Sequence, residues 1–227
     1  MPKVVLPIAN GFYESDSLPI SAQECVNFYP NIAQAPALNQ ETLYGTAGLE
    51  EVANANSITG NRGAHEMNGV PYFVIAGRLY SMAADFTLTF IGEIAGDTRV
   101  SMADNGTQLL ILVPNGNGYI YNHVTDTFSQ ITDTDFTANG NPQLVVYIDG
   151  FFCLTTDSKK FIVSALNDGL SYNALDFGTA ESDPDEIVAP IVFKNQLFIG
   201  GSQTIEAFQN IGGADFPFQR TGLFLSK

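Results

Sequence analysis

From residue 62 onward, short apolar stretches alternate with turn dipeptides along the chain. The first turn, Asn68-Gly69, separates the stretch 62–67 from the apolar run 72–75. Asn-Gly between apolar runs is a strong hairpin signal because both central positions of a type I′ turn need positive φ. The same order returns three more times, with turns at 105–106, 149–150 and 194–195 before apolar runs at 109–113, 151–154 and 197–199. The pattern predicts strands joined by tight turns and requires no helix of normal length.

Each apolar run is followed by another turn, a third strand and a more polar fourth strand. Aligning the third strands on Leu79, Ile120, Ile162 and Ile205 gives repeat intervals of 41, 42 and 43 residues. Four strands per unit at a period of about 40 to 45 residues is the sequence signature of a β-propeller blade. A β-sandwich also has short, regularly spaced strands, but it has no such internal period. We therefore predict an all-β fold, a β-propeller.

The expected organisation is an irregular N-terminal arm followed by a row of blades. Residues 1–60 contain five prolines, which favour extended or irregular chain over regular sheet. The aromatic cluster 27–31 in this arm is interpreted as an anchor that docks the arm onto the body of the protein, and the arm itself as a candidate for reaching a neighbouring protein. We expect about four four-stranded blades, roughly at 61–97, 98–141, 142–186 and 187–221, with residues 222–227 starting a further blade of a larger propeller.

Composition narrows the class of protein. The 227 residues are 45% hydrophobic and 15% charged, so the chain can bury a sizeable core and disorder is not expected. Lys+Arg 9 against Asp+Glu 24 gives a net charge of −15, which disfavours duplex binding through a basic face. No apolar run approaches the ~18 residues of a membrane span. The two cysteines, Cys25 and Cys153, make no disulfide framework, which fits a reducing cytosol.

The residue types that carry most enzyme chemistry are sparse. His65 falls on an expected first strand and His123 in a turn, and neither has a cysteine or carboxylate at metal-ligand spacing. Both are interpreted as structural or surface residues. Ser202 follows two glycines, but Thr204 replaces the second flanking glycine of a nucleophile elbow, and no P-loop occurs. We predict no catalytic residue and no cofactor.

Carboxylates could carry catalysis in such a fold, because some propellers are glycosidases that use paired acids. The acidic cluster Glu181, Asp183, Asp185 and Glu186 is interrupted by Pro184 and is typical of a solvated loop. Calcium at Asp183, Asp185 and Glu186 stays open as an alternative. The segment 133–135 is interpreted as a polar loop, and the segment 101–107, loosely similar to the Asp-box of sialidases, as a hairpin turn. No metal ligand is assigned.

Several stretches are similar to one known family, in order and with similar spacing over nearly the whole chain. They are Arg62-Gly63, 77–80, 92–96 with 99–103, Asp183-Pro184-Asp185 with Ile187, Phe198, Gly200, Ser202 and 204–208, and Tyr29-Pro30-Asn31. The chain thereby resembles the packaged DNA stabilization proteins of short-tailed bacteriophages, which are tail-hub components. The resemblance implies a virion structural protein without catalytic residues, assembled in the host cytoplasm. Family members are longer, so the resemblance also implies that this chain is an N-terminal portion.

The same resemblance implies the partners. Family members form a homo-oligomer, a hexamer at full length, under the portal and its adaptor ring. They close the channel after packaging and carry the tail needle and tailspikes. No sequence-specific nucleic-acid binding is expected, and an acidic wall suits a conduit along which DNA slides without adhering. The alternatives are a carbohydrate-binding or glycan-processing propeller for host recognition, or a repeat scaffold for one protein partner. Exposed aromatic rings flanking a carboxylate pair would favour the carbohydrate alternative.

Overall fold

The computed structural model describes residues 26–32, 34, 41–56, 60–180, 186–213 and 216–226. The chain divides into two compact units, Met1–Glu51 and Val52–Lys227. None of the described segments forms a helix that is long and apolar enough to cross a membrane.

The described residues of the first unit include one antiparallel hairpin. Strands β1 (Phe28–Ile32) and β2 (Glu41–Gly45) pair with Tyr29 opposite Tyr44 and Pro30 opposite Leu43. The two tyrosine rings stack at a centroid distance of 5.8 Å. Phe28, Ile32 and Leu43 lie on the opposite face, and all three are exposed. This hairpin differs from the irregular chain expected for residues 1–60, because in a two-stranded ribbon Pro30 lies at an edge, where a missing donor is tolerated.

The second unit contains four antiparallel sheets, each of four strands. The first sheet comprises β3 (Asn61–Met67), β4 (Val70–Ile75), β5 (Arg78–Met82) and β6 (Leu88–Glu93). The second comprises β7 (Ser101–Asp104), β8 (Gln108–Val113), β9 (Asn117–Asn122) and β10 (Thr127–Gln130). The third comprises β11 (Pro142–Ile148), β12 (Phe151–Thr156), β13 (Lys160–Ala165) and β14 (Asp168–Thr179), preceded by the 3₁₀ turn η1 (Thr134–Thr137). The fourth comprises β15 (Ile187–Phe193), β16 (Gln196–Gly201), β17 (Thr204–Asn210) and β18 (Phe218–Ser226).

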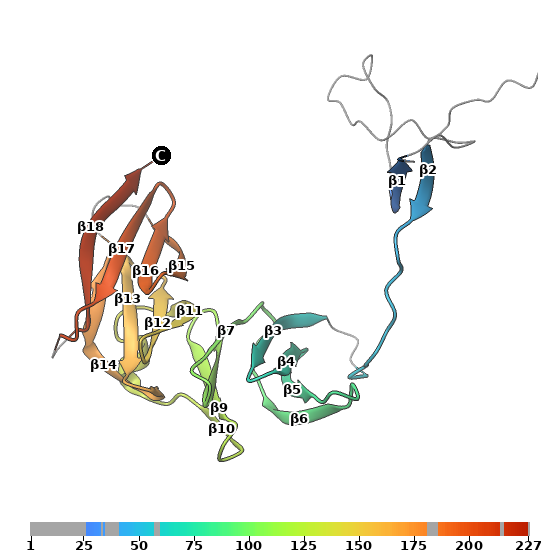
Figure 1. Ribbon diagram of the computed structural model, residues 1–227. Helices are drawn as coiled ribbons and strands as arrows, with labels where there is room; N and C mark the ends of the chain where they lie inside the picture. The colour runs from blue at the N-terminus through green and yellow to red at the C-terminus, as the bar shows by residue number, and fades with distance from the viewer. Residues whose placement is uncertain are drawn as a thin grey trace, which may run out of the picture. The chain divides into compact units, whose positions relative to one another are not determined.

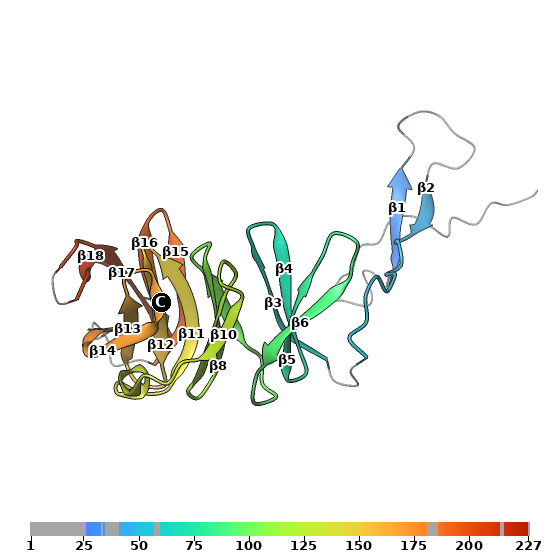
Figure 2. The same cartoon turned by 90° about the horizontal axis from the view of Figure 1, so that it is seen from below.

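The four sheets radiate about a common centre. In Figure 1 the first strands β3, β7, β11 and β15 lie toward the centre of the fan, and the fourth strands lie at its outer rim. Figure 2 shows consecutive sheets standing face to face. Three apolar clusters form the core, and each lies between two consecutive sheets. This arrangement of stacked four-stranded sheets is that of propeller blades.

The second strand of an internal sheet shows why this stacking follows from the sequence. In β8, Leu109 and Ile111 pack toward the first sheet, whereas Leu110 and Leu112 pack toward the third. All four side chains are 0% exposed. Successive side chains of a strand point to opposite faces, so an uninterrupted apolar run needs a neighbour on both sides.

The end of the chain departs from the expected organisation. Residues 222–226, predicted to start a further blade, belong instead to β18, in which Leu225 pairs with Ile205 of β17. The register shifts between the partners of Glu206 and Phe208, and Gly222 lies at this irregularity with a φ of 81°. The bulge accommodates Gly222, so β18 continues through a residue that resembles a turn signal in the sequence.

The repeat register also differs from the predicted one. Ile120 packs between the second and third sheets from the second-sheet side, whereas Ile162 lies in the same cluster from the third-sheet side. A residue of β13 that corresponds to Ile120 must pack toward the fourth sheet, as both neighbours of Ile162, Phe161 and Val163, do. The alignment on Ile162 was wrong by one residue.

Candidate functional site

The first strands of all four sheets contribute to one hollow near the centre of the fan. Its volume is about 310 Å³, and its lining includes His65 of β3, Asp104 of β7, Tyr147 of β11 and Val192 of β15. The central strands of a propeller surround its axis, so we call this hollow the axial surface. The side chains come from positions up to 127 residues apart in the chain.

A His–Asp pair joins the first two sheets at the axial surface. His65 Nε2 lies 2.6 Å from Asp104 Oδ2, and the two side chains are 27% and 23% exposed. Asp104 Oδ1 also accepts a hydrogen bond of 2.8 Å from the backbone N–H of Gly106. This partner of His65 was not expected from the sequence because it lies 39 residues away in the chain. The repeat could have indicated that His65 and Asp104 lie close together, since it places them on the first strands of consecutive units.

One end of the sheets carries acidic side chains with almost no cations to balance them. In an antiparallel sheet of consecutive strands, the loops from first to second and from third to fourth strand lie at the same end. In the described residues, those loops and the strand positions beside them carry five aspartates and one lysine: Asp85, Asp104, Asp126, Asp149, Asp168 and Lys194. We call this end the acidic end.

Aromatic hydroxyls at the acidic end are held by neighbouring polar groups. The Tyr121 hydroxyl donates to Asp126 Oδ1 at 3.0 Å, and the Tyr147 hydroxyl donates to Asn167 Oδ1 at 3.1 Å. The pKa of Tyr121 is raised to about 12, mainly because the hydroxyl is buried and also because it is hydrogen-bonded to Asp126. Tyr121 is 8% exposed and its ring neighbour Tyr72 is 4% exposed. The rings of Tyr72 and Tyr121 are part of the core and offer no flat face for stacking a sugar.

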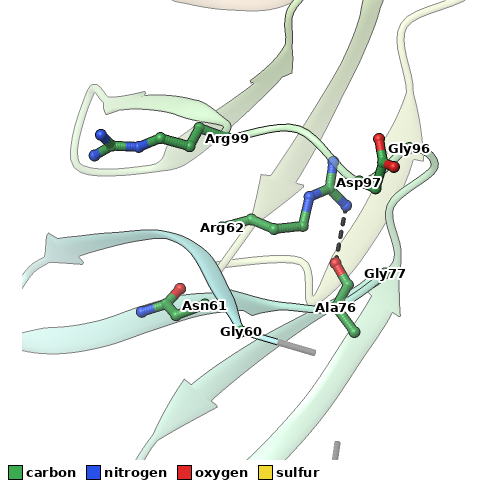
Figure 3. A pocket seen from close by; sticks show the side chains of 8 residues that line it. All are labelled: Gly60, Asn61, Arg62, Ala76, Gly77, Gly96, Asp97 and Arg99. Carbon is green, nitrogen blue, oxygen red and sulfur yellow. Dashed lines mark hydrogen bonds between the residues drawn. The ribbon is translucent and has the colours of Figure 1, made fainter. Parts of the chain in front are cut away.

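A second cavity, of about 370 Å³, lies at the opposite end, beside the connection from the first to the second sheet (Figure 3). Arg62, only 6% exposed, crosses this region. Its guanidinium donates to the backbone carbonyls of Thr98 (2.7 Å), Ala76 (2.9 Å), Ala95 (3.1 Å) and Ile94 (3.3 Å). Burial lowers the pKa of Arg62, and the nearby Asp97 carboxylate opposes that shift. Arg62 therefore fastens the connecting segment to the first sheet and is occupied by the chain itself.

Replacing Arg62 by methionine is expected to lower the free energy of unfolding by about 2 kcal/mol, because a hydrogen bond from a charged group is worth roughly 1.5–3 kcal/mol and water in the adjoining cavity takes over most of the four bonds. Urea unfolding of both proteins measures the difference. Arg99→Met is the matched control, since Arg99 lines the same cavity but is exposed. Equal losses in the two variants would contradict the fastening role of Arg62.

The two aspartates of the 133–135 segment accept hydrogen bonds from backbone N–H groups. Asp133 caps η1 by accepting from the Asp135 N–H at 2.9 Å, and its other oxygen accepts from the Tyr172 N–H at 2.8 Å. Asp135 accepts from the Ala174 N–H at 3.2 Å. These carboxylates hold the loop to β14.

The remaining candidate residues lie apart from one another. His123 is exposed, and its Nε2 lies 3.0 Å from the carbonyl oxygen of Gly106. Ser202 is exposed in a turn. Asp183 and Asp185 lie outside the described residues, and so does Cys25, whereas Glu186 is exposed. Over the described ranges, no three His, Cys, Asp or Glu side chains are grouped so that they could hold a metal ion. Cys153 is buried, and burial raises the pKa of its thiol.

The fan of four-stranded sheets with apolar clusters between consecutive sheets defines a β-propeller protein. Residues 4–226 match the family described as Bacteriophage P22 Gp10, beta-propeller. The chain belongs to this family of phage DNA stabilization and tail-hub proteins, which are structural proteins of the virion.

Solved structures show the same fold at low sequence identity. Virginiamycin B lyase from Staphylococcus aureus is 10% identical with a TM-score of 0.54, covering 87% of this chain and 63% of that one. BamB from Moraxella catarrhalis is 12% identical with a TM-score of 0.52, covering 70% and 49%. The computationally designed Ika4 protein is 9% identical with a TM-score of 0.51, covering 71% and 99%. The matched region thus spans only part of the two natural proteins. No curated protein matches the chain.

Proposed function

We propose that the chain is a tail-hub protein that closes the portal channel, stabilises the packaged DNA and links the portal and adaptor to the tail needle and tailspikes. The observation that carries this proposal is the family match over residues 4–226. The protein acts by assembly, without bond chemistry, as a homo-oligomer in the virion tail after assembly in the host cytoplasm. Its contacts are with proteins rather than with a DNA sequence.

The charge distribution supports a role next to DNA that must remain movable. The chain carries a net charge of −15, and the described part of the acidic end has five aspartates against one lysine. Phosphate contacts to lysine and arginine dominate the affinity of proteins for DNA. An acidic end repels the phosphates, so DNA held near it is confined without adhering.

The β1–β2 hairpin supports a contact with another protein of the tail. A two-stranded hairpin is at best marginally stable in water, and its apolar face needs a neighbour. Phe28 is 53% exposed, Ile32 is 62% exposed and Leu43 is 41% exposed on that face. An exposed apolar patch of this kind marks a protein–protein contact. We assign the hairpin the role of reaching the adaptor ring.

The direct test mixes the full chain with the portal–adaptor complex of its phage and measures the native mass of the product. We expect the wild-type chain to join the complex. The double substitution Phe28→Ser/Ile32→Ser is expected to weaken the association at least tenfold, because it removes the apolar face of the hairpin. Leu175→Ser, at an exposed site on β14, is the control and should bind as wild type does. A wild-type chain that never joins the complex would overturn the proposed function, and tight binding by the double variant would overturn the role of the hairpin.

A further inference from the structure

The cavity beside Arg62 is surrounded by more hydrogen-bond donors than the chain itself uses. We call it the Arg62 cavity; its lining includes Asn61 and Arg62 of β3, Gly77 of the β4–β5 turn, and Asp97 and Arg99 of the segment that connects the first two sheets. Its volume is about 370 Å³. The walls thus belong to one sheet and to the connection that leaves it.

Arg62 is a buried cation without a carboxylate partner. It is 6% exposed, and none of the described carboxylates forms an ion pair with it. Burial lowers the pKa of Arg62, as expected for a cation that is removed from water. A guanidinium has five N–H groups, and four of those in Arg62 donate to backbone carbonyls. Nη2 makes only one of its two possible bonds, so one charged donor remains for a further acceptor.

The backbone of residues 96–99 supplies further donors. Within the described part of the chain, none of these four consecutive N–H groups has a hydrogen-bond acceptor. Gly96 has a φ of 80°, in the left-handed region. A turn of successive N–H groups that contains a left-handed residue makes a concavity suited to an anion.

The side chains of the lining are also rich in donors. Arg99 is exposed and makes no bond to the described residues, so its long side chain is free to turn toward a ligand. Asn61 Oδ1 accepts from the Gly63 N–H at 3.0 Å, which leaves the Asn61 amide N–H groups as donors. Asp97 is the only carboxylate of the lining, and Figure 3 shows it beside the Arg62 guanidinium. Two cations therefore face one carboxylate here, in a chain with a net charge of −15.

We propose that the Arg62 cavity binds the oxyanion of a phosphate or carboxylate group, held by Arg62 Nη2, the Arg99 guanidinium and the backbone N–H groups of residues 96–99. Guanidinium and backbone N–H groups are suited to such oxyanions, and hydrogen bonds to a charged acceptor are roughly twice as strong as neutral ones. A bound anion also gives the buried Arg62 charge a counter-ion. This inference goes beyond the proposed hub function and does not depend on assembly, because the cavity lies within one chain.

The experiment titrates the full chain, labelled with ¹⁵N, with sodium phosphate and separately with sodium acetate, at an ionic strength held constant with sodium chloride. Backbone amide resonances report where each anion binds. The resonances of residues 96–99 are expected to shift and to saturate, whereas those of the turn 157–159 in the third sheet should not move. Saturation by phosphate alone would assign the cavity to a phosphate group, and tighter binding of acetate would assign it to a carboxylate. Failure of both anions to saturate the shifts of residues 96–99 would overturn the inference.

Two substitutions of exposed lining residues test the donors directly, while Arg62 stays in place because it fastens the connecting segment. Arg99→Met is expected to weaken anion binding about fivefold, the effect of losing one solvent-exposed charge pair. Lys159→Met removes an equal charge at an exposed site on the third sheet and should bind as wild type does. Equal weakening by both variants would show that only the overall charge matters and would contradict the proposed site.

The Asp97 carboxylate provides the opposite test. Asp97→Asn is expected to strengthen anion binding about threefold, because it removes the repelling charge beside Arg62. Glu66→Gln, which removes the same charge from an exposed site on β3, is the control and should leave the affinity unchanged. An Asp97→Asn variant that binds no tighter than Glu66→Gln would place the anion elsewhere. No portal or adaptor is present in these titrations, so their outcomes are independent of the test of hub function.

Discussion

Replacing Phe161 by alanine is expected to lower the free energy of unfolding by about 3–5 kcal/mol, the range found for removing a fully buried phenylalanine ring. Phe161 is 0% exposed and lies in the cluster between the third and fourth sheets. Its ring centroid is 4.9 Å from that of Phe208 and 5.7 Å from that of Phe216. A Cβ on Gly178 would collide with the Phe161 ring, so the backbone and the ring are closely fitted at this contact.

Equilibrium urea unfolding, followed by circular dichroism, measures this loss. In a stacked array each sheet depends on its neighbours, so the variant is also expected to show a broader transition as the fourth sheet separates first. Phe86→Ala removes the same ring from a turn where it is 49% exposed, and this control is expected to change stability by less than about 1 kcal/mol. A loss no larger than that of the control would show that the contact between the third and fourth sheets does not hold the stack together.

Replacing Arg220 by methionine is expected to cost about 3 kcal/mol. Glu206 is 1% exposed, and its Oε2 lies 2.6 Å from Arg220 Nε. Arg220 also donates to the backbone carbonyl of Thr179 at 3.0 Å, which links the fourth sheet to the third. Removing one partner of a buried ion pair typically costs ~3–5 kcal/mol because the other charge stays buried. The guanidinium side is 38% exposed, which places the expected loss at the lower end of that range.

A double-mutant cycle identifies the cause of that loss. If the buried Glu206 charge is responsible, Glu206→Gln in the Arg220→Met background is expected to restore at least half of the stability. The measurement is again the free energy of unfolding in urea. Lys159→Met, at an exposed site, is the control for the loss of a cation and should leave stability unchanged. A double variant no more stable than Arg220→Met would instead assign the loss to the bond with Thr179.

The strands and turns of the second unit were largely predictable because local chemistry specifies them. Asn68 and Gly69 both have positive φ, at 54° and 78°, as the Asn-Gly hairpin signal requires. The run 109–113 forms β8 and is buried on both faces, as its uninterrupted apolar character indicated. Such signals lie within a few residues of the structure they cause.

The polar contacts of the site could not be predicted in the same way. His65 meets Asp104 across the boundary between two sheets, and Arg62 meets the carbonyl of Thr98 in the segment that connects those sheets. Each pairing depends on how far one sheet is rotated and shifted against the next, and no local pattern encodes that quantity. The sequence therefore indicated which polar residues exist but not which of them meet.

By itself, the sequence determined that this protein is a row of four-stranded units with apolar second strands and polar fourth strands, because the side-chain pattern and the turn residues act locally. Only the tertiary structure decided which way each side chain faces. Side chains alternate along a strand, so an alignment that is wrong by one residue pairs residues that face opposite ways. Ile162 faces the second sheet, whereas its expected counterpart Ile120 faces the third. The bulge at Gly222 likewise turned an expected new blade into the continuation of β18. Register depends on the packing of whole sheets against one another, and that packing exists only in the folded chain.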